Sequence, residues 1–441
     1  MLAKYPLIQK ALYLACLFFL SLTLNRCQTM PPRGTPILIV SDNETAGAFS
    51  SPVALDSAGD AIMVWVQSDG RYPSIWARRY EVGKGWGTST LIETNPGTAF
   101  DPQIAMDRIG NAIVVWYQGG GDRYNIWANR YQMGNNWGVA TLIETNPVDA
   151  LRPQIAMNGN WNTIVVWVQD DGIWTNHYKL DTGWQAPALI QAGTMDQPQV
   201  AVNESGNGIV IWVQSDEEYN SVYARPFFED SGWGKTTLIE NNVGNAEAPA
   251  VAMNGEGNAI AVWTQHDGRY SSVWANRYHV TAGWGIATRL ATEASRPHVG
   301  MDPNGNGMVV WTHRRGECSK DTRVCTGIPS IWARRYDKVT GWGTATQLAT
   351  KAYDPQIVMD ERGNAIAVWG GNGYIWANYY ETGRSWGTVM RISAYANIIE
   401  HNMAAINEVG NAIVTWDQFT EGTRHVWANR LEMAVERAAT P

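Results

Sequence analysis

The sequence contains few charged residues, little phenylalanine and no surplus of positive charge. Charged residues make up 17% of the 441 positions, and the formal net charge is −8. This balance argues against a helical protein stabilised by many salt bridges, and it removes the electrostatic case for binding nucleic acid or an anionic membrane surface. Only 7 residues are Phe, whereas 23 are Trp. Hydrophobic residues reach 45%, which is enough for a large core and excludes wholesale disorder.

Long hydrophobic runs are also missing, except near the N-terminus. Lys4 and Lys10 precede an apolar run of 14 residues, 11–24, which includes Cys16. This run is too short to span a bilayer comfortably, and a basic region followed by an apolar region is typical of a signal peptide. We therefore predict a signal peptide over residues 1–26 and export of the protein.

Cysteine is scarce, with four residues in the chain. Cys318 and Cys325 lie in a polar insertion, residues 314–326, and an exported protein favours a local disulfide between them. A zinc site is the weaker alternative, because no second cysteine pair would complete four ligands.

A further cysteine, Cys27, follows directly after the predicted signal peptide. Leu24 and Cys27 resemble a bacterial lipobox, although Asn25 and Arg26 are not the small residues expected before the cysteine. Two locations therefore stay open: a lipoprotein lipidated at Cys27 on the outer membrane or cell surface, and a soluble extracellular protein. Any membrane contact would be limited to the lipid at Cys27.

A motif recurs along the chain at intervals of about 50 residues. In one copy its four elements are residues 102–107, 110–116, 126–131 and 137–144. The Trp that closes the second element marks eight copies: Trp65, Trp116, Trp167, Trp212, Trp263, Trp311, Trp369 and Trp416. The insertion at residues 314–326 falls inside the sixth copy and is therefore predicted to be a loop.

Each copy reads as four short strands separated by turns. Runs rich in Val, Ile, Trp and Thr alternate with Gly, Asn and Asp, and no segment has a helical period of useful length. The first turn opens on Asp or Asn, and Gly follows three residues later in every copy but the third, which has Trp161 there. Both faces of the second strand are apolar, as expected for a sheet covered on both sides. The sequence predicts an all-β protein, an eight-bladed β-propeller of four-stranded blades.

The two ends of the repeat array are complementary. The eighth copy stops after residue 430 without its fourth strand, and residues 34–40 align with the fourth strand of the first copy, residues 87–93. We therefore predict that the N-terminal strand completes the last blade and closes the ring. The expected organisation is a signal peptide, a short linker over residues 27–33 and a single propeller domain over residues 34–441, and we expect the ring to be monomeric.

The repeated Trp, Arg and Glu residues suggest two interpretations. Trp rings that fill the space between blades would explain the second-strand set without any ligand. The Trp of the Gly-Trp-Gly segment, with an Arg at the end of the third strand and a Glu at the end of the fourth, could instead hold a sugar between its aromatic face and polar groups. The rival explanation of the charged residues is Arg–Glu pairing between adjacent blades.

With these repeats, residues 34–430 resemble the Trp-rich tandem repeats of secreted bacterial β-propeller proteins, and the blades are similar to propeller lectins, including fucose-binding ones. The resemblance implies sugar binding in clefts between blades through Arg, Glu and Trp. Carried over to this sequence, it points to Arg79, Trp86, Glu93, Arg130, Trp137, Glu144, Arg277 and Trp284. Other blades depart from this pattern, since His177 and Pro226 replace the Arg and Gln191 replaces the Glu.

Signs of catalysis are weak in the sequence. The seven His residues share no repeat position and no metal-ligand spacing, and no nucleophile elbow or phosphate loop occurs. We therefore expect a non-enzymatic binding protein without catalytic residues, metal or cofactor, and a glycosidase is less favoured. Its expected partner is a cell-surface glycan. The alternative is a surface protein captured by the insertion at residues 314–326, which would make the propeller an interaction scaffold.

Overall fold

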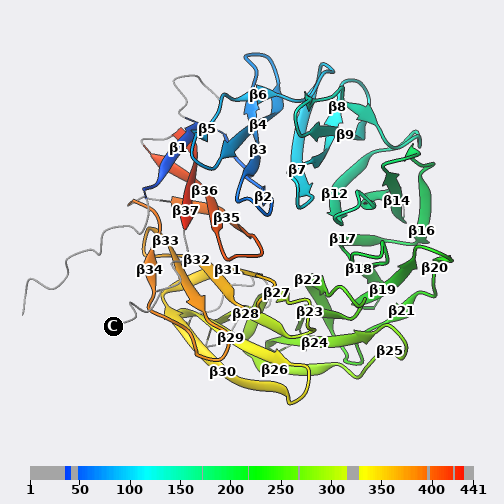
Figure 1. Cartoon of the computed structure of the whole chain (residues 1–441). Coiled ribbons are helices and arrows are strands. Elements are labelled where there is room, and N and C mark those ends of the chain that lie inside the picture. The colour runs from blue at the N-terminus through cyan, green and yellow to red at the C-terminus, as the bar shows by residue number, and fades with distance from the viewer. Residues whose placement is uncertain are drawn as a thin grey trace, which may run out of the picture.

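The computed structural model describes residues 35–40, 48–170, 172–216, 218–266, 269–314, 327–394, 398–420 and 423–431. Within these ranges the chain forms strands and no helix, and the strands make eight small antiparallel sheets arranged in a ring (Figure 1). The predicted eight-bladed β-propeller is confirmed. No helix in the described ranges is long and apolar enough to cross a membrane.

Each blade runs outward from the axis of the ring, and blades are numbered here in chain order. The innermost strands of blades 1 to 8 are β2 (Val53–Leu55), β7 (Thr98–Met106), β12 (Ala150–Met157), β17 (Met195–Val202), β22 (Asn245–Met253), β27 (Ala294–Met301), β31 (Ala352–Met359) and β35 (Ile398–Ile406). The second strands are β3 (Ala61–Ser68), β8 (Ala112–Gly119), β13 (Thr163–Gln169), β18 (Gly208–Ser215), β23 (Ala259–His266), β28 (Gly307–Arg314), β32 (Ala365–Gly371) and β36 (Ala412–Thr420).

The outer half of each blade is less regular than the inner half. The third strands are β4 (Pro73–Glu81), β9 (Tyr124–Gln132), β14 (Gly172–Lys179), β19 (Asn220–Phe228), β24 (Ser271–His279), β29 (Pro329–Asp337), β33 (Tyr374–Tyr380) and β37 (Thr423–Leu431). In blades 1 to 5 the fourth strand is split into two pieces: β5 (Gly85–Trp86) and β6 (Thr90–Leu91), β10 (Asn136–Trp137) and β11 (Thr141–Leu142), β15 (Gly183–Trp184) and β16 (Ala188–Ala192), β20 (Gly232–Trp233) and β21 (Thr237–Leu238), β25 (Gly283–Trp284) and β26 (Thr288–Thr292). The fourth strands of blades 6, 7 and 8 are β30 (Gly341–Thr350), β34 (Met390–Arg391) and β1 (Ile37–Val40).

The ring closes as predicted. β1 pairs antiparallel with β37, so that Ile37 lies opposite Ala428 and Leu38 opposite Trp427. The last blade therefore takes its outer strand from the beginning of the chain.

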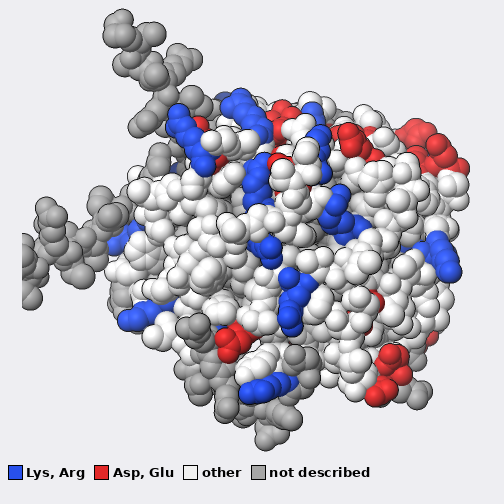
Figure 2. All heavy atoms as spheres, turned by 90° about the horizontal axis from the view of Figure 1, so that it is seen from below, with Lys and Arg blue, Asp and Glu red and all other residues white. Residues whose placement is uncertain are grey.

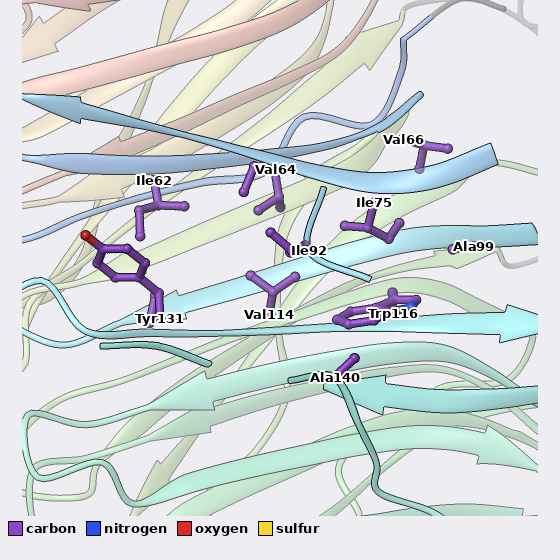
Figure 3. Packing of buried hydrophobic residues seen from close by; sticks show 12 residues of the cluster. Ile62, Val64, Val66, Ile75, Ile92, Ala99, Val114, Trp116, Tyr131 and Ala140 are labelled. Carbon is purple, nitrogen blue, oxygen red and sulfur yellow. The ribbon is translucent and has the colours of Figure 1, made fainter. Parts of the chain in front are cut away.

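The core lies between the blades. The eight second-strand Trp residues are each at most 1% exposed. Between blades 1 and 2, for example, Ile62 and Val64 of β3 pack against Val114 and Trp116 of β8 (Figure 3). The second-strand Trp set is therefore structural, and these large rings fill the space between neighbouring sheets.

The Asp/Asn turn joins the innermost strand to the second strand. Asp107 is buried, and its Oδ1 accepts hydrogen bonds from the backbone N–H groups of Ile109 (3.0 Å) and Asn111 (2.8 Å). Gly110 has a positive φ of 91°, which Gly adopts without strain. In the third blade Trp161 occupies this position at φ 66° and packs against Tyr178.

The two faces of the ring differ in their connections. The turn face carries the Asp/Asn turns and the turns from third to fourth strands, such as residues 107–111 and 133–135. The linker face carries the connections to the next blade, such as residues 94–97, and the loops from second to third strands. At the axis of the turn face Arg108 contacts Glu361 (2.6 Å), Glu408 (3.3 Å) and Glu204 (3.4 Å), which belong to three other blades.

Candidate functional site

The predicted arginines lie near the turn face and connect neighbouring blades. The guanidinium of Arg79 contacts Asp60 (2.7 Å) and Glu81 (2.8 Å), and it lies 5.6 Å from the centre of the Tyr131 ring in blade 2. The same inter-blade cation–π contact recurs as Arg130 over Tyr178, Arg277 over Tyr336, Arg335 over Tyr380 and Arg430 over Tyr80. These arginines therefore join blades by packing on tyrosines, an arrangement different from the expected Arg–Glu pairing.

The predicted glutamates lie at the linker face. Glu93 is 6% exposed, and its Oε2 accepts hydrogen bonds from Gln118 Nε2 (2.9 Å) and the backbone N–H of Asn95 (3.1 Å). Gln118 belongs to the next blade, and its Oε1 accepts a hydrogen bond from Trp116 Nε1. Glu144 is held in the same way by Gln169. These carboxylates tie each linker to the core of the following blade.

The predicted Trp residues of the fourth strand each pack on a Tyr of their own blade. The ring centres are 5.4–5.5 Å apart in the pairs Tyr80–Trp86, Tyr131–Trp137 and Tyr278–Trp284. Because the third and fourth strands are antiparallel, the Arg at the end of one and the Glu at the end of the other lie at opposite faces. Ile92, next to Glu93, bonds to Ile75, four positions along β4 from Arg79 and about 13 Å away at 3.3 Å per residue.

The structure therefore does not bring Arg79, Trp86 and Glu93 together in one cleft, and the equivalent set in blade 2 is divided in the same way. In blade 5, Arg277 lies over Tyr336 of blade 6, and Trp284 packs on Tyr278 of its own blade. As ligand contacts, the eight residues stay a prediction.

A cavity of about 390 Å³ lies at the linker face where blade 4 meets blade 5. It is formed by the linker after β21, by β23 and β24 of blade 5, and by β26 at the outer edge. Its lining residues are Asn242, Val243, Gln265, Ser272, Trp274 and Arg289. The volume is within the range of small-ligand sites, and the lining combines one aromatic ring with amide, hydroxyl and guanidinium groups.

Two hydrogen-bonded anchors hold the polar wall of this cavity. Gln265 is 2% exposed; its Oε1 accepts from Trp263 Nε1 (2.9 Å) and its Nε2 donates to the carbonyl of Gly244 (2.6 Å). The carboxylate of Glu240 accepts from the backbone N–H of Asn242 (3.0 Å), and burial raises the pKa of Glu240. The linker and the amide are therefore positioned before any ligand arrives.

The aromatic wall is formed by Trp274, which is half-buried and lies directly opposite Arg289 in the pairing of β24 with β26. The guanidinium of Arg289 is exposed and lies 5.8 Å from the centre of the indole ring. Blades 1 to 4 have a leucine at the position of Arg289: Leu91, Leu142, Leu189 and Leu238. Trp274 and Arg289 were missed as site residues, although aligning the repeats reveals the change from Thr-Leu to Thr-Arg.

Across the described part of the chain, no group of three or more His, Cys, Asp or Glu side chains is arranged to hold a metal ion. Several sequence predictions concern residues outside the described ranges: the signal peptide, the linker and Cys27, the Cys318–Cys325 disulfide, and all of the insertion except Arg314. They stay predictions, as does the protein-partner alternative that depends on the insertion.

Comparison with known proteins identifies a fold and no family. No family model matches the sequence, and no curated protein matches it. Among solved structures, the polysaccharide lyase Uly1 has a TM-score of 0.54 at 10% identity, with 92% of this chain and 100% of that chain covered. The Dos1 propeller has a TM-score of 0.51 at 9% identity, with 90% and 94% covered. The fucose-recognising six-bladed lectin of Aleuria aurantia has a TM-score of 0.36 at 13% identity, with 65% and 93% covered. At these identities the likeness establishes a β-propeller.

One expectation needs correction at this point. From the sequence we predicted that the protein is not an enzyme. This prediction is wrong, because a known enzyme has the same fold. Uly1 is a polysaccharide lyase and has the same propeller fold over nearly the whole chain. The β-propeller fold by itself therefore does not exclude catalysis.

Proposed function

We propose that the protein recognises a carbohydrate in the cavity between blades 4 and 5. The observation that carries this proposal is the half-buried Trp274 ring, which lines a cavity together with Gln265, Ser272 and Arg289. A pyranose ring has a flat C–H face that packs on an indole, and its hydroxyl groups pair with amide and guanidinium groups. One structural neighbour, the polysaccharide lyase Uly1, agrees with this ligand class.

The cavity explains how a ligand would be oriented. The indole of Trp274 would supply the apolar contact on one side. Gln265, fixed by Trp263 and the linker, would offer its remaining hydrogen-bonding capacity at a defined place. Since this amide is ordered in advance, binding would cost little side-chain entropy. We further propose that recognition takes place outside the cell, in keeping with the signal peptide predicted from the sequence.

The first test is a glycan array with the intact chain, followed by titration of the sugars that bind. We expect Trp274→Ala to weaken binding roughly tenfold or more, since the lost aromatic contact corresponds to about 1.4 kcal/mol. Trp76→Ala is the matched control, because Trp76 holds the same position in blade 1 beneath Leu91. Both variants are first checked for an unchanged thermal unfolding transition.

The same samples should be monitored for new reducing ends and unsaturated products, so that turnover is detected along with binding. Equal binding by wild type, Trp274→Ala and Trp76→Ala would contradict the proposed site. Equal losses in the two folded variants would place the sugar elsewhere on the ring.

A further inference from the structure

We propose, resting on the carbohydrate function above, that the ligand is an anionic linear polysaccharide that lies along the outer rim of blades 5 to 7. The inference comes from one register position that differs between consecutive blades. On the fourth strand, the residue opposite the third-strand aromatic ring is leucine in blades 1 to 4. In blades 5, 6 and 7 it is Arg289, Gln347 and Arg391.

The two classes of residue have different surroundings. The four leucines are 39–47% exposed and lie beside half-buried aromatic rings, so that this part of the rim is apolar. In blade 5 the guanidinium of Arg289 lies 5.8 Å from the Trp274 ring. In blade 7 Arg391 lies 5.0 Å from the ring of Tyr374, which meets Trp376 edge-on. Blades 5 and 7 therefore each present a cation beside aromatic rings.

No carboxylate in the described part of the chain neutralises these two cations. Neither Arg289 nor Arg391 forms an ion pair with a carboxylate in the described residues, whereas Arg79 and Arg108 each contact two or more carboxylates. Arg391 Nε is buried and has no hydrogen-bond partner among those residues. A guanidinium with free donors is suited to an oxyanion, which it can bind through two parallel hydrogen bonds.

The charge of the surrounding rim agrees with this ligand class. Figure 2 views the molecule from below in Figure 1, where blades 5 and 6 lie, and shows Lys and Arg side chains across the middle of that side. On the third and fourth strands and their turns, residues 271–292, 329–350 and 374–391, the chain has seven basic and two acidic residues. The basic residues are Arg277, Arg289, Arg334, Arg335, Lys338, Arg384 and Arg391. This excess of positive charge occurs on a protein whose formal net charge is −8.

The arrangement over three consecutive blades points to a chain and not to a single sugar. Arg289, Gln347 and Arg391 hold the same register position in neighbouring blades, so a polymer that follows the rim would meet a cation, an amide and a second cation. Linked subsites of this kind gain affinity through effective concentration. The anionic group is a uronate carboxylate or a sulfate ester, which share the oxyanion chemistry that a guanidinium recognises.

The test uses the intact protein and three polymers: polygalacturonate, its carboxyl-reduced neutral counterpart and a sulfated carrageenan. The variants are Arg289→Leu, Arg391→Leu and the double variant, which give blades 5 and 7 the leucine of blades 1 to 4. Lys235→Gln is the matched control, because it removes one positive charge from an exposed residue of the fourth strand region of blade 4. Unfolding transitions confirm that all four variants are folded.

We expect each single variant to weaken binding of the preferred anionic polymer by about fivefold to tenfold, and the double variant by about 30-fold or more. Lys235→Gln should change it less than about twofold. Tighter binding of polygalacturonate would identify the carboxylate as the recognised group, and tighter binding of carrageenan the sulfate. Oligomers too short to reach blade 7 should respond to Arg289→Leu and not to Arg391→Leu.

Three results would overturn the proposal in different ways. Equal losses on the anionic and neutral polymers would remove the charge selectivity and leave carbohydrate recognition intact. If Arg391→Leu leaves binding unchanged at every polymer length while Arg289→Leu weakens it, the polymer contacts a single site in blade 5 and does not extend to blade 7. Folded wild-type protein that binds none of the three polymers and no sugar on the array would overturn the proposed function as well.

Discussion

Blades 1 to 4 and blades 5 to 7 have the same backbone plan but present different outer surfaces. In the first group a half-exposed leucine lies beside each third-strand aromatic ring, and in the second the same position is Arg, Gln and Arg. The third and fourth strands with their turns have seven basic and four acidic residues in the four blades of the first group, and seven basic and two acidic in the three blades of the second. A repeat fold can therefore keep its core constant and place recognition on one arc of the ring.

The largest expected effect concerns the buried core, which blades 1 to 4 and blades 5 to 7 have in common. We expect Trp116→Ala in blade 2 and Trp311→Ala in blade 6 each to lower the free energy of unfolding by about 3–5 kcal/mol, because each removes a fully buried indole. Chemical denaturation measures the change. If only one of the two variants is destabilised, the cores of the two arcs are not equivalent.

The next effect concerns a blade contact that departs from the Arg–Tyr pattern. His177 replaces the Arg at the junction of blades 3 and 4, and its ring centre lies 4.4 Å from that of Phe227. Burial lowers the pKa of His177 from 6.5 to about 4. The folded state therefore binds fewer protons than the unfolded state between these values, so this contribution is complete above pH 6.5 and is lost as the pH falls toward 4.

A shift from 6.5 to about 4 corresponds to about 3 kcal/mol at 1.36 kcal/mol per pKa unit. The free energy of unfolding, measured between pH 7 and pH 4, should fall by about this amount. His177→Gln should make the free energy of unfolding less dependent on pH. His298, at the junction of blades 6 and 7, is partly buried, and desolvation lowers its pKa from 6.5 to about 4 as well. His298→Gln is therefore the parallel test within blades 5 to 7. If neither His177→Gln nor His298→Gln reduces the pH dependence of the free energy of unfolding, the explanation is refuted.

The smallest expected effect comes from giving a blade of the first group the surface residue of the second group. Leu238→Arg gives blade 4 the residue of blade 5 beside Tyr223. We expect affinity for an anionic polymer to rise about twofold to threefold, since a new exposed cation extends the basic rim by one blade. Leu91→Arg, in the distant blade 1, is the control and should have a smaller effect. A larger gain in blade 1 than in blade 4 would contradict a continuous track over neighbouring blades.

The sequence contained more information on the fold than on the site, and the reason is physical. Eight copies of a four-strand pattern average out local ambiguity, and the missing last strand could be matched to residues 34–40, which is why ring closure was predicted correctly. The grouping of Arg79 with Glu93 overlooked strand direction. Two residues at the ends of successive antiparallel strands lie at opposite faces, so a shared repeat does not imply a shared cleft.

The cavity residues show the converse limit. Trp274 belongs to a set of eight aromatic positions, and nothing in its own segment separates it from the others. Its distinction comes from Arg289 across the strand pair and from the linker of the preceding blade, a combination that only the assembled ring produces. An alignment of the eight copies would have revealed Arg289, whereas the cavity itself depends on packing between blades.

The pairing of β1 with β37 has a consequence for the order in which the molecule is made. Leu38 is among the first propeller residues synthesised, and its partner Trp427 is among the last. At roughly 5–20 residues per second, β1 waits about 20–80 s for its partner. During that time its apolar residues, and the face of blade 1 that packs on blade 8 through Met63 and Trp65, need protection from other chains. A nascent chain that stops short of the eighth blade never gains that protection, so closure of the ring depends on synthesis of β37.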